Sequence, residues 1–224
     1  MNPTQFGPNE DFSRYPRTFE ADLELARSCG TQYVFAPTQE VIYPEGFSTY
    51  IDVARVSEPL CGKFRPGHFR GVATVVNRLF QIVRPQVAYF GQKDLQQCLV
   101  IDRMVRDLEL PVKLAICPTV REEDGMAKSS RNRYLSTEER VRATVIWRAL
   151  EAARIAFAGG ERDAGKLASI ARDVLVSVPE FATQYCEVRS LPLLGEISRI
   201  EGPAALAIAG FLGKTRLIDN LILT

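Results

Sequence analysis

The sequence predicts an α/β protein in which a doubly wound parallel sheet is followed by a smaller α+β domain. In the first half, short apolar runs alternate with segments of helical spacing, and the order strand–helix–strand–helix–strand favours a parallel sheet with right-handed crossovers. In the second half, two helical segments come first and strand-like runs follow. We therefore expect a boundary near Thr119, with domains at residues 1–119 and 120–224.

The elements of the first half follow from the period of the apolar residues. Amphipathic helices are expected at residues 18–29, 67–83 and about 94–108. Gly30 ends the first helix and Pro85 ends the second. Strands are expected where apolar runs are short and bounded by turn residues, at residues 33–35, 49–53, 87–90 and 112–117.

The second half begins with a strong helix signal. Ser136 and Glu139 have the spacing of a capping box, which predicts one helix that continues to about Ala158 and ends at Gly159 and Gly160. A second helix is expected at residues 163–176. Strands are expected at residues 183–189, 205–212 and 216–223.

The composition indicates a globular protein and excludes several classes. With 28 basic and 27 acidic residues, the chain lacks the basic excess of a nucleic-acid binder. Five scattered cysteines without CxxC spacing indicate reduced thiols and a cytoplasmic protein. No apolar run reaches membrane-spanning length, and the N-terminus resembles no targeting peptide. The single histidine, His68, excludes a multi-histidine metal site, and we expect no metal held by the protein alone.

The segment FGQKD follows the buried strand predicted at residues 87–90. Ligands bind at the carboxyl ends of strands in open α/β sheets, and the following helix start offers free N–H groups to phosphate. Gly91 permits close backbone approach, Lys93 supplies a positive charge, and Asp94 could cap the helix or hold a ribose hydroxyl. The alternative is an ordinary turn with an exposed lysine and a capping aspartate.

The segment GMAKSSRNRYL places Lys128, Ser129, Ser130 and Arg131 on a glycine-flanked loop. Two cations and two hydroxyls suit a polyphosphate. The alternative is a solvated turn before the helix at Ser136. Because this loop follows the last strand of the sheet that also ends in FGQKD, both loops can face one cleft. His68, in RPGHF, has no partner nearby in sequence and is interpreted as a structural hydrogen-bonding residue.

Read in order, several motifs resemble the pantothenate synthetase (pantoate–β-alanine ligase) family across essentially the whole chain. They are NPTQF, RYPRT, YVFAPTQEVIYPEG, RPGHFRGV, FGQKDLQQ, VREEDGMAKSSRNRYL and TRLIDN. The resemblance implies a Rossmann-like fold of the nucleotidylyltransferase superfamily. It also implies ATP-dependent activation of pantoate to pantoyl adenylate, with release of pyrophosphate, followed by displacement of AMP by β-alanine.

The resemblance also implies roles for individual residues. ATP contacts would come from Gly91, Gln92, Lys93, Asp94, Val120, Lys128, Ser129, Ser130 and Arg131. Lys93 and Arg131 would be catalytic, because they would neutralise charge on the leaving pyrophosphate. Gln5 and Gln97 would hold pantoate, with Asn2 supporting that pocket. Mg²⁺ would accompany the ATP phosphates, and a homodimer is implied.

One departure from the family pattern is clear: the chain has no H-x-G-H motif, and His68 cannot replace it. Aligned on NPTQF, the sequence begins several tens of residues late, so we expect it to lack the first βα portion of the sheet. The family usually has an apolar residue such as Val where Met1 stands, and we interpret the chain as a truncated gene model in which an internal Val codon was taken as the start. Such a chain is expected to be poorly soluble and inactive alone, because a missing parallel strand exposes apolar surface. Alternatives are a catalytically dead remnant that binds nucleotide or pairs with a full-length subunit, and another adenylyltransferase of the superfamily.

Overall fold

The computed structural model of the chain describes residues 2–5, 7 and 18–224. Met1 and most of the RYPRT motif lie outside these residues. Helices are α1 (Phe19–Ser28), α2 (Gln39–Ile42), α3 (Cys61–Phe64), α4 (His68–Val83), α5 (Leu95–Asp107), α6 (Thr137–Arg142), α7 (Val145–Ala158) and α8 (Ala164–Val176). Strands are β1 (Val87–Gly91), β2 (Lys113–Cys117), β3 (Phe181–Ser190), β4 (Ala204–Leu212) and β5 (Thr215–Leu223). Short 3-10 turns are η1 (Pro3–Gln5), η2 (Gln92–Asp94) and η3 (Ser130–Tyr134).

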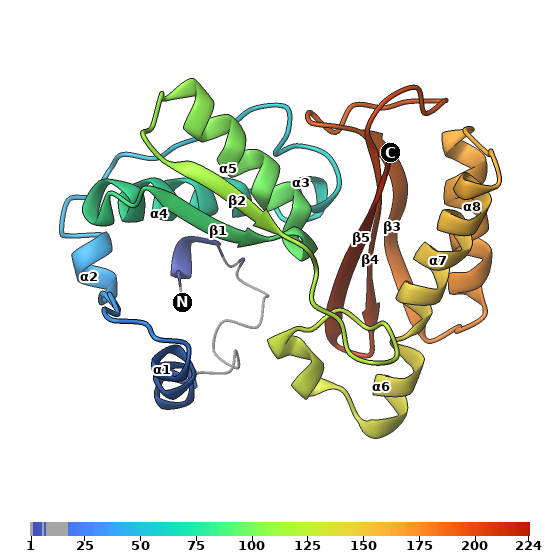
Figure 1. Ribbon diagram of the computed structural model, residues 1–224, viewed down its shortest axis with the longest axis horizontal. Helices are drawn as coiled ribbons and strands as arrows, with labels where there is room; N and C mark the ends of the chain where they lie inside the picture. The colour runs from blue at the N-terminus through green and yellow to red at the C-terminus, as the bar shows by residue number, and fades with distance from the viewer. Residues whose placement is uncertain (1, 6, 8–17) are drawn as a thin grey trace.

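The N-terminal half contains the predicted parallel sheet. β1 and β2 pair in parallel, with Val87 opposite Lys113 and Gly91 opposite Cys117. Helix α5 connects the two strands and contacts both α4 and β1 (Figure 1). The sheet is covered incompletely, since no residue of β1 is buried and the side chain of Tyr89 is 72% exposed.

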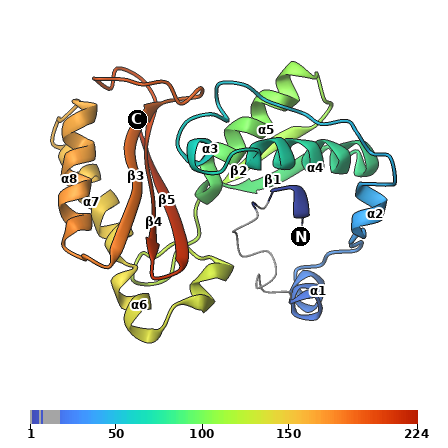
Figure 2. The ribbon, with the colours of Figure 1, turned by 180° about the vertical axis from the view of Figure 1, so that it is seen from behind.

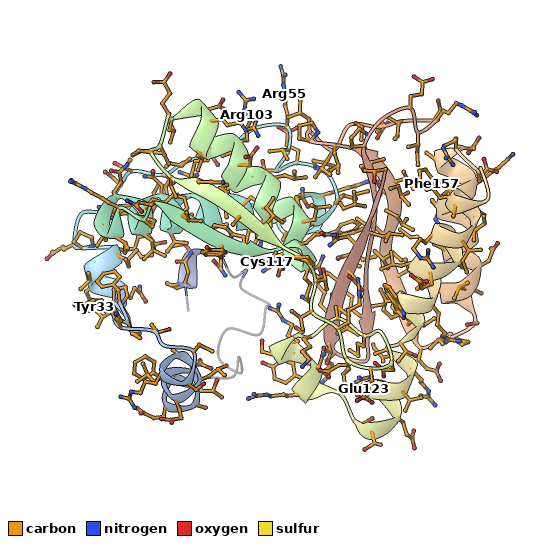
Figure 3. The ribbon with its side chains drawn as sticks, viewed as in Figure 1. Tyr33, Arg55, Arg103, Cys117, Glu123 and Phe157 are labelled. Atoms are coloured by element: carbon orange, nitrogen blue, oxygen red, sulfur yellow. The ribbon has the colours of Figure 1, made fainter. Side chains whose placement is uncertain are left out.

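Two strands expected in this half do not form. Residues 33–35 and 49–53 are outside any strand, although both are apolar runs. Tyr33, at the outer edge of the molecule in Figure 3, is 90% exposed. The backbone N–H of Ile51 donates to the hydroxyl of Thr74 on α4 at 3.0 Å. Because these backbones find no strand partner in the described part of the chain, their apolar character alone does not make them strands.

The C-terminal half is an antiparallel sheet in the order β3-β4-β5. Helices α7 and α8 pack on one face of this sheet, and the N-terminal half lies against the other (Figures 1 and 2). One core cluster joins Ile208 and Leu217 to the helices, whereas a second cluster joins Ala207, Ala209 and Tyr185 to α4 and α5. The sheet is therefore buried on both faces, and the expected division at Thr119 stays a prediction.

The capping box is confirmed, but the helix after it is shorter than predicted. The Ser136 hydroxyl accepts the Glu139 N–H at 3.2 Å, and the Glu139 carboxylate accepts the Ser136 N–H at 2.9 Å. The single helix expected up to Ala158 is divided into α6 and α7. At the break, the Thr144 hydroxyl donates to the carbonyl of Val141 at 2.7 Å and competes with the helical backbone bonds.

Candidate functional site

A cavity of about 430 Å³ lies between the two halves, where the predicted phosphate loops meet. Its lining comes from η1, the end of α3, the start of α4, η2, α5, the loop before η3 and the first residues of η3. The lining residues are Gln5, Arg65, His68, Lys93, Asp94, Gln97, Lys128, Ser129, Ser130 and Arg131. Four of them are cations and one is a carboxylate, so the site favours an anionic ligand.

The first loop of the site begins where β1 ends at Gly91. Asp94 occupies the N-cap position of α5, but its side chain makes no capping hydrogen bond, and the residue lines the cavity. The Cys98 thiol donates to the Gly91 carbonyl at 3.3 Å. Burial raises the pKa of Cys98 to about 12, which keeps this thiol protonated as a donor. The loop is thus held from the helix that follows it.

The second loop starts from a short hairpin. Glu122 N–H bonds to the Met126 carbonyl at 2.8 Å, and Lys128 N–H bonds to the Val120 carbonyl at 2.9 Å. Gly125 at the turn has a φ of +85°, and a Cβ there would lie 2.0 Å from the Trp147 ring. Only glycine fits this position without movement of Trp147. The hairpin therefore delivers Lys128 to the cavity from a closely packed base.

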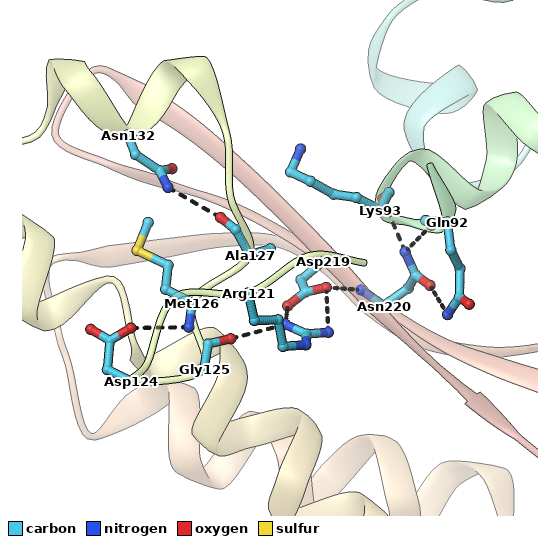
Figure 4. Close-up of polar contacts among 10 residues, drawn as sticks. All are labelled: Gln92, Lys93, Arg121, Asp124, Gly125, Met126, Ala127, Asn132, Asp219 and Asn220. Carbon is cyan, nitrogen blue, oxygen red and sulfur yellow. Dashed lines mark hydrogen bonds and ion pairs between the residues drawn. The ribbon is translucent and has the colours of Figure 1, made fainter. Parts of the chain in front are cut away.

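The KSSR segment has its own local order. The Ser129 hydroxyl accepts the Arg131 N–H at 3.3 Å, and the Asn132 side chain donates to the Ala127 carbonyl at 3.1 Å. In Figure 4, Lys93 extends from its loop toward the Ala127–Asn132 side of the site, across the space between the two loops. The two predicted phosphate loops do face one another.

Gln5 reaches the cavity because η1 packs closely on α4. A Cβ at Gly71 would lie 2.2 Å from the Thr4 carbonyl, so this glycine allows the approach. The Asn2 amide donates to the Gly71 carbonyl at 3.1 Å and to the Gln5 side-chain oxygen at 3.3 Å. Asn2 does not line the cavity but bonds to Gln5, which does; the supporting role predicted for Asn2 stays a prediction.

His68 is a structural hydrogen-bonding residue, as predicted, but it also lines the cavity. Its Nδ1 lies 2.7 Å from the Gln5 carbonyl, and its Nε2 lies 3.1 Å from the Arg65 guanidinium. Because a carbonyl only accepts and a guanidinium only donates, these contacts fit a neutral imidazole with its proton on Nδ1. Arg65 also donates to the Gln5 carbonyl at 3.2 Å.

The two adjacent glutamines of the DLQQ segment have different environments. Gln96 is buried, accepts the Cys61 N–H at 3.0 Å, and donates to the carbonyls of Val56 and Pro59. Gln97 lines the cavity. Consecutive residues of a helix point about 100° apart, so one side chain fastens a loop while the other faces the site.

The structure brings most of the predicted site residues together, but not all. The lining includes Gln5, Lys93, Asp94, Gln97, Lys128, Ser129, Ser130 and Arg131. Gly91, Gln92 and Val120 lie outside it, and Val120 is 65% exposed at the base of the hairpin. Arg65 was not predicted; the signal was a cation next to a helix start in RPGHF. Among the described residues, no group of three or more His, Cys, Asp or Glu side chains could hold a metal ion.

Comparisons with known proteins agree with one another. The family model "Pantoate-beta-alanine ligase" matches residues 1–222. The chain is 53% identical over 223 residues to the pantothenate synthetase of Pelotomaculum thermopropionicum, and covers 100% of itself and 79% of that protein. It is 54% identical over 225 residues to pantothenate synthetase 1 of Bradyrhizobium diazoefficiens, with the same shares covered.

Solved structures give the same family. The crystal structure of the pantothenate synthetase from Thermus thermophilus is 48% identical with a TM-score of 0.95, over 98% of this chain and 80% of that one. The pantoate-β-alanine ligase of Francisella tularensis, complexed with β-γ ATP and β-alanine, has a TM-score of 0.77 at 31% identity, over 99% and 76% of the two chains. The predicted α/β class, with a parallel sheet and a C-terminal α+β unit, is confirmed.

Proposed function

Because the chain belongs to the pantoate–β-alanine ligase family, we propose that its cavity binds ATP and pantoate for the condensation of pantoate with β-alanine. The observation that carries this proposal is the convergence of three distant segments on one cavity. Lys93, Arg131 and Gln5 come from η2, η3 and η1, and each lines the same 430 Å³ space. Cations beside amide side chains suit a triphosphate next to a hydroxy acid.

The reaction proceeds in two balanced steps in this proposal. A carboxylate oxygen of pantoate attacks the α-phosphorus of ATP, the bond to the bridging oxygen breaks, and pyrophosphate leaves. The amine of β-alanine then attacks the acyl carbon of pantoyl adenylate, the bond to AMP breaks, and the amine loses a proton. Lys93 and Arg131 stabilise the charge that develops on pyrophosphate, since both cations line the cavity on opposite loops.

The remaining contacts follow from the lining. Gln5 and Gln97 hold pantoate through their amides, and Asn2 orients Gln5. Asp94 accepts a ribose hydroxyl, because its carboxylate is not used as a helix cap. Lys128, Ser129 and Ser130 contact the phosphates in the same proposal. Gly91 and Gln92 shape the loop, and Val120 meets the adenine beyond the cavity, at the exposed base of the hairpin.

Mg²⁺ enters with ATP in this proposal. The ion prefers oxygen ligands and keeps several waters, so the phosphate oxygens of ATP suit it. When bound, it neutralises phosphate charge. The chain's own cations then orient the triphosphate against the acid.

Turnover by these 224 residues alone is expected to be very low. The one histidine, His68, contacts the Gln5 carbonyl through Nδ1 and Arg65 through Nε2. Because both ring nitrogens already have partners, we do not expect His68 to stabilise the reacting phosphate. The nucleotide-binding remnant, which would bind ATP or pair with a full-length subunit, is therefore the second candidate. Another adenylyltransferase of the superfamily is the third, and a pantoate-dependent exchange assay separates it from the first.

Compartment and assembly are further parts of the proposal. All five cysteines are unpaired, which suits a reducing cytoplasmic environment. A homodimer through the N-terminal half is supported by the exposed Tyr89 and Val87 on its sheet. Light scattering on the purified chain tests the dimer. Within residues 2–5, 7 and 18–224, no helix is long and apolar enough to cross a membrane.

The test of the proposed function is calorimetric titration with MgATP. Lys93→Met and Arg131→Met each weaken binding by about tenfold, as expected for a lost charge-assisted bond. The matched control is Lys113→Met, which removes an exposed lysine of β2 outside the cavity lining. Absence of MgATP binding, or equal affinity in all four proteins, would overturn the proposal. Pantoate-dependent exchange of pyrophosphate into ATP then identifies the acid.

A further inference from the structure

Two polar residues interrupt the apolar strand β5 at its centre. Asp219 and Asn220 are each 4% exposed within TRLIDNLIL. Buried polar groups destabilise a fold unless they are hydrogen-bonded. Because adjacent residues of a strand point to opposite faces, one of this pair faces the helices of the C-terminal half and the other faces the N-terminal half.

Asn220 holds the loop that carries Lys93. Its amide nitrogen donates to the carbonyls of Gln92 at 2.9 Å and of Lys93 at 3.0 Å. The Gln92 side chain returns a bond to the Asn220 oxygen at 3.4 Å. Both protons of the amide are used on backbone that is 127 and 128 residues away in sequence (Figure 4). Strand β5 thus fixes where η2 enters the cavity.

Asp219 holds the hairpin that carries Lys128. Its carboxylate accepts two bonds from the Arg121 guanidinium, at 2.6 and 3.2 Å, and one from the Asn220 N–H at 2.8 Å. The Arg121 guanidinium lies 4.0 Å from the centre of the Trp147 ring and donates to the Gly125 carbonyl at 3.0 Å. The hairpin turn is therefore tied to β5 through a single arginine (Figure 4).

We infer that Asp219 and Asn220 are positioning residues that set the separation of the two phosphate loops. Neither residue lines the 430 Å³ cavity; both line an adjoining cavity of about 90 Å³ that shares Lys93 and Arg131 with it. Their hydrogen bonds go to the two loops, so we assign their role to holding the loops. The two residues are adjacent on β5, so their side chains lie on opposite faces of the sheet and one residue can hold each loop. The inference rests on the proposed binding of ATP between these loops.

Two near-isosteric variants test the contact of Asn220 with the Lys93 loop and the contact of Asp219 with the hairpin separately. Asn220→Asp loses both donors and faces two carbonyls with a carboxylate, so the Gln92–Lys93 backbone must move. Asp219→Asn keeps the shape but loses the charge that pairs with Arg121. Each variant is expected to weaken MgATP binding about tenfold. Leu221→Val, a small apolar change next to the pair on β5, is the matched control and keeps wild-type affinity.

Two measurements on the nucleotide-free protein test positioning directly. Hydrogen exchange is expected to rise at residues 91–95 in Asn220→Asp, at residues 121–131 in Asp219→Asn, and at neither in Leu221→Val. Trp147 is the only tryptophan of the chain, so its fluorescence reports the Arg121 contact. The emission is expected to change in Asp219→Asn and to stay the same in Asn220→Asp.

The outcomes are distinct. Wild-type protein that does not bind MgATP overturns the proposed function, whereas the exchange pattern still decides the positioning role. If Asn220→Asp and Asp219→Asn both keep the hydrogen exchange and the MgATP affinity of the wild type, the inference is overturned. If either variant fails to fold, Arg121→Lys and Asn220→Ser remove the same bonds more gently, because lysine cannot bond bidentately and serine cannot reach both carbonyls. The same two results in these variants would then overturn the inference.

Discussion

β1 and β4 are both built of small and apolar residues, yet no residue of β1 is buried, whereas eight of the nine residues of β4 are buried. The difference comes from what packs on each sheet. β4 is the central strand of a sheet with helices on one face and the N-terminal half on the other. Within the described residues, β1 pairs with β2 alone, and it exposes Tyr89.

The loop that follows β1 is held in place by residues outside its own sheet. The loop after β1 leaves a sheet that is covered incompletely, so the sheet alone does not hold it in place. Bonds from α5 through Cys98 and from β5 through Asn220 supply the missing support. The C-terminal half therefore positions both the hairpin at residues 120–128 and the loop that follows β1.

The largest expected effect is a difference in the free energy of unfolding between a variant in β4 and a variant in β1. Ile208→Ala removes a fully buried side chain of β4 and is expected to lower the free energy of unfolding by about 3–4 kcal/mol. Tyr89→Ala, on the exposed face of β1, is expected to cost less than about 1 kcal/mol. Urea denaturation followed by circular dichroism measures both. A larger loss for Tyr89→Ala would reverse the comparison.

The next effect concerns the hairpin base. Gly125→Ala adds a Cβ 2.0 Å from the Trp147 ring at a φ of +85° and is expected to destabilise by about 2–3 kcal/mol. Gly30→Ala, at a φ of +79° in open space, has the backbone strain alone and is expected to cost about 1 kcal/mol. Thermal unfolding of the two variants gives the difference. Equal losses would mean that Trp147 moves aside easily.

Thiol reactivity compares the two halves in the folded protein. Cys98 in the N-terminal half and Cys186 in the C-terminal half are both buried, and burial raises the pKa of each to about 12. Cys29 and Cys117 are exposed. With Ellman's reagent at about pH 8, we expect the exposed pair to react first, then Cys98 through local opening, and Cys186 last. Cys186 reacting before Cys98 would contradict our expectation that the sheet buried on both faces opens less readily.

The smallest expected effect is a pH dependence on the hairpin. Asp124 pairs with Arg140 at 2.7 and 3.1 Å, and this contact lowers the pKa of its carboxyl below 3.8. A lowered pKa means stability that is present above about pH 4 and lost as the pH falls through the folded-state pKa. Both side chains are partly exposed, so Asp124→Asn is expected to cost at most about 0.5 kcal/mol at pH 7. Denaturation at pH 7 and pH 3 measures it, and a difference that is as large at pH 3 as at pH 7 would exclude this ion pair as its source.

Local pattern was sufficient for much of the fold. The spacing of apolar residues predicted helices α1, α4 and α5 to within two residues, and the capping box at Ser136 formed as expected. These features depend on neighbours a few positions away in sequence. The same reasoning was wrong for residues 33–35 and 49–53, because a strand needs a partner that local sequence does not describe.

The sequence by itself determined the class of the fold, the family, and the loops that carry Lys93 and Lys128. Only the tertiary structure decided how those loops are held. His68 has its partner in Gln5, 63 residues away, and Asn220 bonds to backbone 127 residues away. A buried Asp-Asn pair inside an apolar strand signals that partners exist, since most buried polar groups are hydrogen-bonded. Which partners they are depends on long-range packing, and no local period of the sequence contains that information.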